Sequence, residues 1–405
     1  MRGDAVTSAP ATPGGDVAAL EDRHTSGVYS KRPLVIVRGS GAKLWDSQGR
    51  EYIDCIGGHG VANVGHCHPG VVAAIREQAG RLITCQESFY NDQRAELQAE
   101  LVRIAPPGLD RVFLCNSGAE AVEAAIKFAR LLTGRTNLIA ANNGFHGRTL
   151  GALSATWRKE YRQPFEPLLP GFMHVPFNDL AAMAEVIDED TAAVILEVVQ
   201  GEGGVTLGEG GYLRGVQSLC RERGALLILD EVQTGFGRSG RMFACQHHGL
   251  EPDLMCLAKG IAGGVPMGAT LIHQRFGELQ KSAHGSTFGG SALACAAALA
   301  TIHALEAESL PQRAADLGEH FLSLLRAIDS PLIRDVRGLG LMVGVQLKRR
   351  AAPYVAALME HGVLALPAGP VVLRFLPPLV IGRAELETVS QAVEEVLLSG
   401  ANANG

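Results

Sequence analysis

The chain has 405 residues, of which 47% are hydrophobic and 19% charged, a composition typical of a globular protein and not of a disordered or fibrous one. Its 36 basic and 42 acidic residues give a net charge of −6, which argues against general binding to nucleic acid or to a membrane surface. The length exceeds what one hydrophobic core usually serves, so two domains are expected.

Residues 1 to about 18 lack periodicity and are rich in Ala, Thr, Pro and Gly, which predicts a mobile tail. They lack the apolar core of a secretory signal and the arginine-rich character of a transit peptide, so a cytoplasmic protein is expected. The eight cysteines form no CxxC pair, and several lie in apolar runs, as in a reducing compartment. The runs His66–Cys67–His68 and His247–His248 cannot easily converge on one ion, so we expect no metal site.

The first regular structure expected in the chain is a strand, turn and strand between Leu34 and Ile53. A glycine-rich loop follows from Gly57 to Gly65, but its spacing does not match a dinucleotide-binding fingerprint. Either a close approach of the backbone to a ligand or a plain turn explains these glycines.

A helix is expected directly after the short strand Arg111–Cys115. Ser117 or Asn116 can cap this helix, Glu120 suits its first turn, and Gly134 ends it. A turn of small residues that opens a helix presents free N–H groups and the positive end of the helix dipole, which is a phosphate site. An ordinary capped helix is the alternative and would be favoured if this feature stood alone.

Two apolar runs in the middle of the chain are each followed by a residue that can take part in catalysis. Ala225 to Leu229 is followed by Asp230, and Leu254 to Ala258 is followed by Lys259. Both runs are typical of buried parallel strands, so the acid and the lysine would meet at the sheet edge where α/β proteins hold ligands. Pyridoxal phosphate needs this pair, a lysine for its aldehyde and a carboxylate for its pyridine nitrogen. The alternative is a strand-end acid and an unrelated surface lysine.

Three further features leave alternatives open. Phe145, flanked by glycines after the strand Leu138–Ala141, could stack on a flat ring or anchor the core. Arg374 lies in an apolar strand, where it needs a partner, either a substrate carboxylate or an internal salt bridge. Residues 285–305 carry no formal charge, but their Gly, Ser, Thr and Ala content favours a buried helix over a membrane span.

Six motifs occur together and in a fixed order. They are NSGAEAVEAAIKFAR at 116–130, GFHGRT at 144–149, ILEVVQGEGGV at 195–205, LILDEVQTGFGR at 227–238, LAKGIAGGVPMGA at 257–269 and HGSTFGG at 284–290. Through them the chain resembles the class III aminotransferases of the fold-type I pyridoxal phosphate family, over nearly everything after residue 20. One departure is Glu197–Val198, where the family usually has Glu-Pro, and we expect it to affect loop geometry and not chemistry.

The resemblance implies an α/β fold, with a large domain built on a mostly parallel seven-stranded sheet between helices and a smaller α/β domain. After the tail at 1–18, we expect residues 19–70 to join the small domain. Residues 71–290 would form the large, cofactor-binding domain, and residues 291–405 the C-terminal small domain with its connecting helix.

The resemblance also implies roles for single residues. Lys259 would hold the cofactor through its aldehyde and then act as general base and acid, while Asp230 would keep the pyridine nitrogen protonated. In the family, the residue at Thr287 reaches the phosphate of the neighbouring subunit's cofactor, so a homodimer with shared active sites is implied. The expected cofactor-binding residues are Ser117, Gly118, Ala119, Phe145, Glu197, Asp230, Val232, Gln233, Lys259 and Thr287.

Within this set, Val232 and Phe145 would enclose the cofactor ring, Gln233 would contact its phenolic oxygen, and Gly118 and Ala119 would donate N–H groups to the phosphate. The expected substrate contacts are Arg148, Glu202, Ser286 and Arg374. Glu202 resembles the glutamate that pairs with the carboxylate-binding arginine for an ω-amine and releases it for glutamate or 2-oxoglutarate.

Within the family the likeness is to acetylornithine aminotransferases and, more closely, to relatives that act on aminoadipate semialdehyde held on the amino-group carrier protein of lysine biosynthesis. The expected reaction is amino transfer between glutamate or 2-oxoglutarate and the ω-semialdehyde of carrier-linked 2-aminoadipate, with an acidic carrier as partner. The alternatives are N-acetylornithine of arginine biosynthesis, or both substrates, a semialdehyde aminomutase that needs no glutamate, and a non-catalytic binding module.

Overall fold

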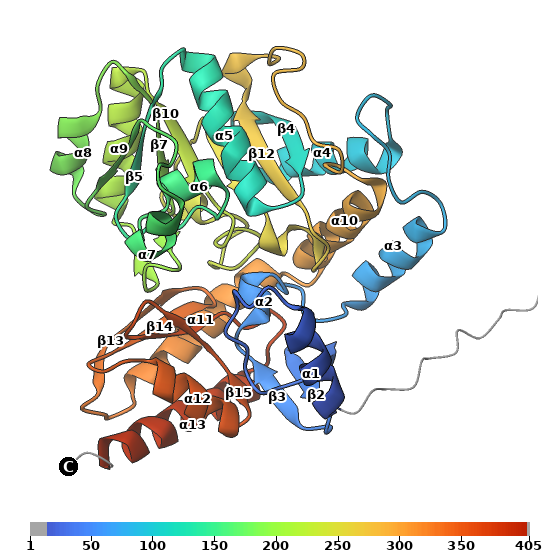
Figure 1. Cartoon of the computed structure of the whole chain (residues 1–405), viewed down its shortest axis with the longest axis vertical. Coiled ribbons are helices and arrows are strands. Elements are labelled where there is room, and N and C mark those ends of the chain that lie inside the picture. Colours follow the sequence, from blue (N-terminus) through green and yellow to red (C-terminus); the bar gives the residue numbers. More distant parts are fainter. Residues whose placement is uncertain (1–13, 403–405) are drawn as a thin grey trace, which may run out of the picture.

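The computed structural model describes residues 14–402, in which a seven-stranded sheet and two four-stranded sheets form the framework (Figure 1). Residues 1–13 of the predicted tail at 1–18 lie outside the described residues. From Gly14 onward the chain is helical in α1 (Gly14–His24), so regular structure begins within the predicted tail. Asp16 in the first turn and Arg23 and His24 in the last turn complement the helix dipole.

The large sheet has the strand order β4-β12-β11-β10-β7-β5-β6. Its strands are β4 (Leu109–Cys115), β5 (Asn137–Ala141), β6 (Phe172–Val175), β7 (Thr191–Leu196), β10 (Leu226–Asp230), β11 (Leu254–Leu257) and β12 (Gly268–His273). β12 runs antiparallel to β11 and β4, and the other neighbouring strands pair in parallel. The predicted α/β fold with a mostly parallel seven-stranded sheet is therefore confirmed.

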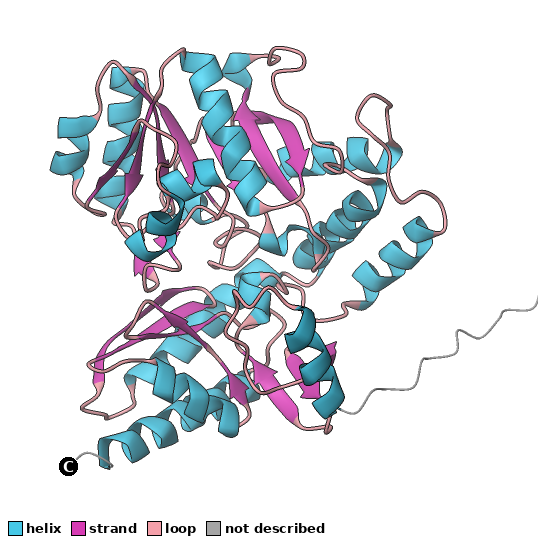
Figure 2. Ribbon diagram, viewed as in Figure 1, coloured by secondary structure: helices cyan, strands magenta, loops and turns pink. Residues whose placement is uncertain are grey.

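Helices cover this sheet and its edges (Figure 2). They are α3 (Pro69–Ala79), α4 (Asp92–Ile104), α5 (Gly118–Thr133), α6 (Leu150–Ala155), α7 (Lys159–Arg162), α8 (Leu180–Val186), α9 (Gly210–Arg223) and α10 (Ala292–Ala307). Successive strand residues point to opposite faces, so Leu226 and Ile228 pack in one core cluster and Leu227 and Leu229 in another. Every residue of β7, β10 and β11 is buried, as expected for parallel strands covered on both faces.

Several short elements complete this part of the molecule. The hairpin of β8 (Val199–Gln200) and β9 (Thr206–Leu207) follows β7. The 3₁₀ turns are η1 (Gln163–Phe165), η2 (Ala244–His247), η3 (Lys259–Ala262) and η4 (Gln274–Phe276). Of these, η3 begins at the predicted cofactor lysine.

The second part of the molecule joins the two ends of the described chain (Figure 1). One sheet pairs β1 (Ile36–Ser40), β2 (Lys43–Asp46) and β3 (Glu51–Asp54) with the C-terminal β15 (Val363–Leu364). The other has the order β13-β14-β17-β16, with β13 (Ile333–Leu339), β14 (Met342–Leu347), β16 (Leu366–Ala368) and β17 (Val372–Phe375). Its helices are α2 (Gly57–Gly60), α11 (Leu310–Arg326), α12 (Ala352–Glu360) and α13 (Arg383–Asn402).

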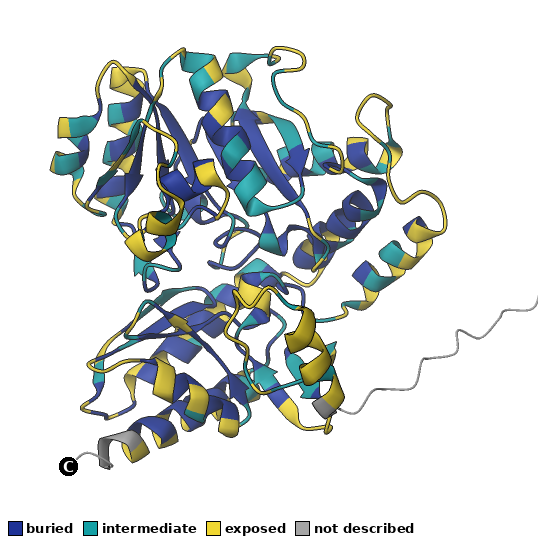
Figure 3. Cartoon of the chain, viewed as in Figure 1, coloured by how far each residue is buried: buried dark blue, intermediate teal, exposed yellow. Residues whose placement is uncertain are grey.

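The alanine-rich α10 is largely buried and packs against α3 and α4 (Figure 3). Among residues 14–402, no single helix is both long and apolar enough to cross a membrane. Only α10 and α11 together reach that length and composition, and the two helices are bent by 60°.

Candidate active site

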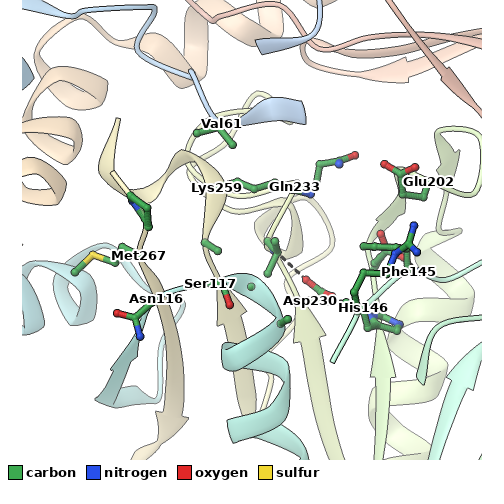
Figure 4. A pocket seen from close by; sticks show the side chains of 18 of the residues that line it. Val61, Asn116, Ser117, Phe145, His146, Glu202, Asp230, Gln233, Lys259 and Met267 are labelled. Atoms are coloured by element: carbon green, nitrogen blue, oxygen red, sulfur yellow. Dashed lines mark hydrogen bonds and ion pairs between the residues drawn. The ribbon is translucent and has the colours of Figure 1, made fainter. Parts of the chain in front are cut away.

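A pocket of about 460 Å³ lies at the carboxyl ends of β10 and β11, facing the second part of the molecule (Figure 4). Most of the predicted site residues line it: Ser117, Gly118, Ala119, Phe145, Arg148, Glu197, Glu202, Asp230, Val232, Gln233 and Lys259. The sequence separates these residues by up to 142 positions, and the strand and helix ends bring them to one place.

Asp230 ends β10 and is 5% exposed, with both carboxylate oxygens engaged. Oδ1 accepts the backbone N–H of Val232 at 3.0 Å, and Oδ2 lies 2.8 Å from Nδ1 of the fully enclosed His146. Burial opposes the charged form of His146, but the hydrogen bond to Asp230 and the charges of Asp230 and Glu197 together raise its pKa. The histidine therefore holds the Asp230 carboxylate in place at the strand end.

Lys259 follows β11 with φ 45°, in the left-handed region that a residue other than glycine seldom adopts. Figure 4 shows its extended side chain entering the pocket. Burial lowers the pKa of the Lys259 amine, and the carboxylates of Glu202 and Asp230 only partly oppose this effect. A lowered pKa leaves more of the neutral amine, which is the form that acts as nucleophile and base.

The N-terminus of α5 forms the floor of the pocket beside Asp230. Ser117 caps the helix by accepting the N–H of Glu120 at 3.2 Å, and Gly134 ends it with φ 69°, as predicted. The N–H groups of Gly118 and Ala119 belong to the first turn, which has no intrahelical acceptors. A Cβ at Gly118 would lie 2.7 Å from Cγ1 of Val232 and would displace that side chain.

Glu197 is buried behind the loop that carries Phe145. Its carboxylate accepts the N–H of Phe145 at 3.0 Å and that of Gly201 at 3.4 Å. Burial and the charge of Asp230 raise the pKa of Glu197, although His146 opposes them. Glu197 therefore fixes the loop position of Phe145, whose ring lines the pocket.

Arg374 on β17 is 1% exposed and finds its partner across the pocket. Its Nη1 lies 2.7 Å from Oε1 of Glu202 and donates to Oε1 of Gln233 at 3.3 Å. Of the two partners that the sequence left open for this arginine, the structure contains the internal salt bridge. Burial alone would raise the pKa of Glu202, but the charge and hydrogen bond of Arg374 lower it.

The structure leaves two predicted residues outside this pocket. Thr287 is exposed on the loop before α10. Ser286 is also outside, but its Oγ accepts a hydrogen bond at 3.1 Å from Nδ2 of Asn116, which lines the pocket. Arg148 lines the pocket mouth and is exposed.

Sequence reasoning missed several pocket residues, and His146 is the most important of them. It lies between Phe145 and Arg148 in the GFHGRT motif, and its place in that motif was the signal that could have identified it. The other missed wall residues are Val61, Asn116, Gly147, Ala258, Gly264, Val265, Pro266 and Met267. Val61, from the N-terminal segment, carried no chemical signal that could have identified it. Among residues 14–402, no group of three or more His, Cys, Asp or Glu side chains is arranged to hold a metal ion.

The buried aspartate, the strand-end lysine and the free N–H groups of α5 fit the pyridine nitrogen, aldehyde and phosphate of pyridoxal phosphate. The fold and site thus define a pyridoxal phosphate-dependent enzyme with an α/β architecture. The chain belongs to the class III aminotransferases, because the family model described as aminotransferase class-III matches residues 26–397.

Individual relatives agree with this family. The [LysW]-aminoadipate semialdehyde transaminase of Deinococcus radiodurans is 50% identical over 94% of this chain and 89% of its own length. The acetylornithine aminotransferase of Methanopyrus kandleri is 47% identical over 94% of this chain and 99% of its own. The solved ornithine aminotransferase of Toxoplasma gondii is 35% identical, with a TM-score of 0.93 over 98% of this chain and 97% of that one.

The chain is therefore a pyridoxal phosphate-dependent aminotransferase. The bound cofactor supplies an electron sink that makes the carbon beside the transferred amine acidic enough to lose a proton. The protein's own contribution is to hold a buried carboxylate at the strand end and to lower the pKa of a lysine amine within the pocket by burial.

Proposed function

We propose that this chain moves an amino group between glutamate or 2-oxoglutarate and the ω-semialdehyde of 2-aminoadipate held on an amino-group carrier protein, in lysine biosynthesis. The 50% identity to a transaminase named for such a carrier-linked substrate supports this choice. Two curated proteins from Pyrococcus, 44% identical, carry names that include both the aminoadipate and the glutamate semialdehyde.

The ion pair of Arg374 with Glu202 is the observation that carries the dual use of one site. An ω-amine brings no carboxylate to the reacting end, so the arginine there stays neutralised by Glu202. Glutamate brings a carboxylate, which replaces Glu202 as partner. Glu202 is a quarter exposed and lies in a hairpin turn, and Nε of Arg374 is buried without a hydrogen-bond partner among the described residues. These features support an exchange of partners.

In this assignment Lys259 holds the cofactor and carries the proton, and Asp230 contacts the pyridine nitrogen. Ser117, Gly118 and Ala119 bind the phosphate. Phe145 and Val232 enclose the ring, Gln233 contacts its phenolic oxygen, and Glu197 supports Phe145. Arg148 and Ser286 lie on the substrate side.

The same proposal includes a homodimer in which Thr287 reaches the neighbouring subunit's cofactor. Thr287 and the adjacent Phe288 are exposed, the latter by 64%. The segment beside them also exposes apolar side chains, among them Phe89 (64%) and Tyr90, and Arg94 ties the two segments by donating to the carbonyls of Phe89 and Gly290. An apolar patch of this kind supports a subunit interface. Eight free thiols in the described residues support a cytoplasmic location.

Acetylornithine aminotransferase is the second candidate, because relatives with that name are 47% identical over 94% of this chain. The test measures the glutamate-dependent transfer rate on N-acetylornithine and on carrier-linked lysine in parallel. A large preference for the carrier-linked substrate supports the proposal, and comparable rates indicate an enzyme that serves both routes. Activity on N-acetylornithine alone would replace the first choice by the second, and turnover without glutamate would indicate an aminomutase.

A further inference from the structure

Two arginines meet around one tyrosine at the mouth of the pocket. The Arg148 guanidinium carbon lies 3.6 Å from the centre of the Tyr161 ring, and that of Arg158 lies 5.7 Å from it. Arg158 also donates from Nη1 to the Tyr161 hydroxyl at 3.4 Å. The Tyr161 ring in turn meets the Phe145 ring edge to face, with centres 6.2 Å apart. Arg148, Tyr161 and Arg158 therefore form one group, which contacts the pocket wall at Phe145.

This group, Arg148, Tyr161 and Arg158, stands where the two parts of the molecule face each other. Arg148 lines the pocket, while Arg158 reaches the turn between β16 and β17: a Cβ on Gly369 would lie 3.2 Å from its Nη2. β17 carries Arg374. In Figure 1, α7, which holds Tyr161, lies on the side of the large part that faces β13 and β14. The group thus lies between the pocket wall and the turn that leads into the strand of Arg374.

Neither guanidinium of the group has a carboxylate partner within residues 14–402. Arg148 contacts the Phe145 and Tyr161 rings only through their faces, and Arg158 has the hydroxyl described above. Two like charges within about 6 Å of one ring centre repel each other, and the ring faces offset this only in part. A bound anion would remove the repulsion, and guanidinium groups bind carboxylates through paired N–H donors.

We propose that Arg148 and Arg158, held by Tyr161, form an anion subsite for a carboxylate on the group attached to the substrate's α-amine. This subsite deepens the proposed function and rests on it, because a carrier-linked substrate carries a bulky acyl group in that direction and an acetyl group carries no charge there. Arg148 borders the pocket and contacts the amino acid part, and Arg158 contacts the additional carboxylate. Tyr161 is a positioning residue that keeps both guanidiniums in place.

A matched pair of small substrates tests the subsite without the carrier. N-glutarylornithine and N-pentanoylornithine have acyl chains of the same length, ending in a carboxylate and in a methyl group. We expect the wild type to prefer the glutaryl compound in kcat/KM, and Arg158→Gln to lower that value about tenfold for the glutaryl compound alone. The preference should fall as salt is added.

Lys159→Gln is the matched control, since it removes the same charge from the neighbouring exposed position. We expect the two substrates to keep their wild-type ratio in this variant, and the glutamate half-reaction to stay within about twofold of wild type in both variants. Tyr161→Phe should reduce the glutaryl preference less than Tyr161→Leu, because phenylalanine keeps the ring face and loses only the hydroxyl contact.

A wild type without glutaryl preference, or an equal loss for Arg158→Gln and Lys159→Gln, would overturn the subsite. The outcome for the proposed function is separate. If the glutaryl preference depends on Arg158 but carrier-linked lysine is not a substrate, the subsite stands and the carrier assignment fails. If carrier-linked lysine is a substrate and Arg158→Gln leaves its kcat/KM unchanged, the subsite fails and the carrier assignment stands.

Discussion

The two walls of the active-site pocket are built in different ways. On the sheet side, Asp230, Lys259 and the N-terminus of α5 are placed by the ends of regular elements, and Asp230 is held by His146 and the Val232 N–H. On the other side, Glu202 and Arg374 come from separate elements and hold each other by one ion pair of 2.7 Å. A site that receives one cofactor and several substrates needs one wall that stays fixed and one that can change. In the proposed function, the fixed wall carries what every half-reaction needs, and the pair of Glu202 and Arg374 exchanges partners with the substrate.

The largest expected effect is on the fixed wall, at Lys259. Lys259→Ala removes both the covalent attachment and the proton carrier, so we expect kcat to fall by at least about 10³-fold. The pocket keeps its other contacts, so pyridoxal phosphate should still copurify but should no longer be fixed to the chain by borohydride reduction. Transamination near the wild-type rate in this variant would refute the assignment of the lysine.

Asp230→Asn tests the same wall while keeping the size of the side chain. Loss of the charge removes the partner of the pyridine nitrogen and of His146, and we expect both half-reactions to slow by about 10²-fold. Asp253→Asn is the control, because Asp253 is a buried acid beside the same strands that accepts the Leu227 N–H away from the pocket. It should lower stability and leave the rate per folded enzyme intact. An effect of Asp230→Asn confined to one half-reaction would place Asp230 on the substrate side instead.

The fixed wall could largely be predicted from the sequence. On the exchangeable wall the sequence marked Arg374 as an arginine that needs a partner, but only the resemblance pointed to Glu202. Apolar runs ending in Asp230 and Lys259 indicated strand ends at one sheet edge, and Ser117 and Gly134 marked the two ends of α5. Contacts between elements leave no such signal, because periodicity reports burial and not which side chains meet. The pair His146–Asp230 spans 84 residues. Similarly, nothing local in the sequence joins Glu202 to Arg374, and α1 was missed because its short pattern resembled the tail before it.

The exchangeable wall should respond differently to the loss of each partner. Arg374→Ala should weaken the glutamate half-reaction most, by about tenfold or more in kcat/KM, because the substrate carboxylate loses its partner. Glu202→Gln should instead raise KM for the ω-amine substrate by about tenfold, since the arginine then stays unpaired at the reacting end. Measuring both half-reactions separately in each variant checks the split. Equal losses in both half-reactions would mean that the pair supports structure only.

A smaller effect is expected at Arg337, which ties the Glu202 hairpin to β13. Its guanidinium donates to the carbonyls of Gly204 and Val205 and pairs with Asp335 at 2.7 Å. Arg337→Met keeps much of the packing but frees the hairpin that carries Glu202. We therefore expect the ratio between the KM values for glutamate and for the ω-amine substrate to change by about two- to fivefold. Arg334→Met, on the same strand, is the control. A fall in kcat for both half-reactions without a change in their KM ratio would contradict the positioning role.

The smallest expected effect is a pH dependence of stability within the fixed wall. The pKa of His146 is raised above its ordinary value of 6.5, mainly by Asp230 acting against burial. Protonated His146 therefore favours the folded state, and this contribution is complete below about pH 6.5 and is lost as the pH rises through the folded-state pKa. Thermal unfolding of the cofactor-free protein between about pH 6 and pH 8 should show a decline in Tm of about 2 °C beyond that of His146→Gln. Parallel curves for the two proteins would mean that Asp230 is held without help from a histidine charge, and that the fixed wall depends on backbone geometry alone.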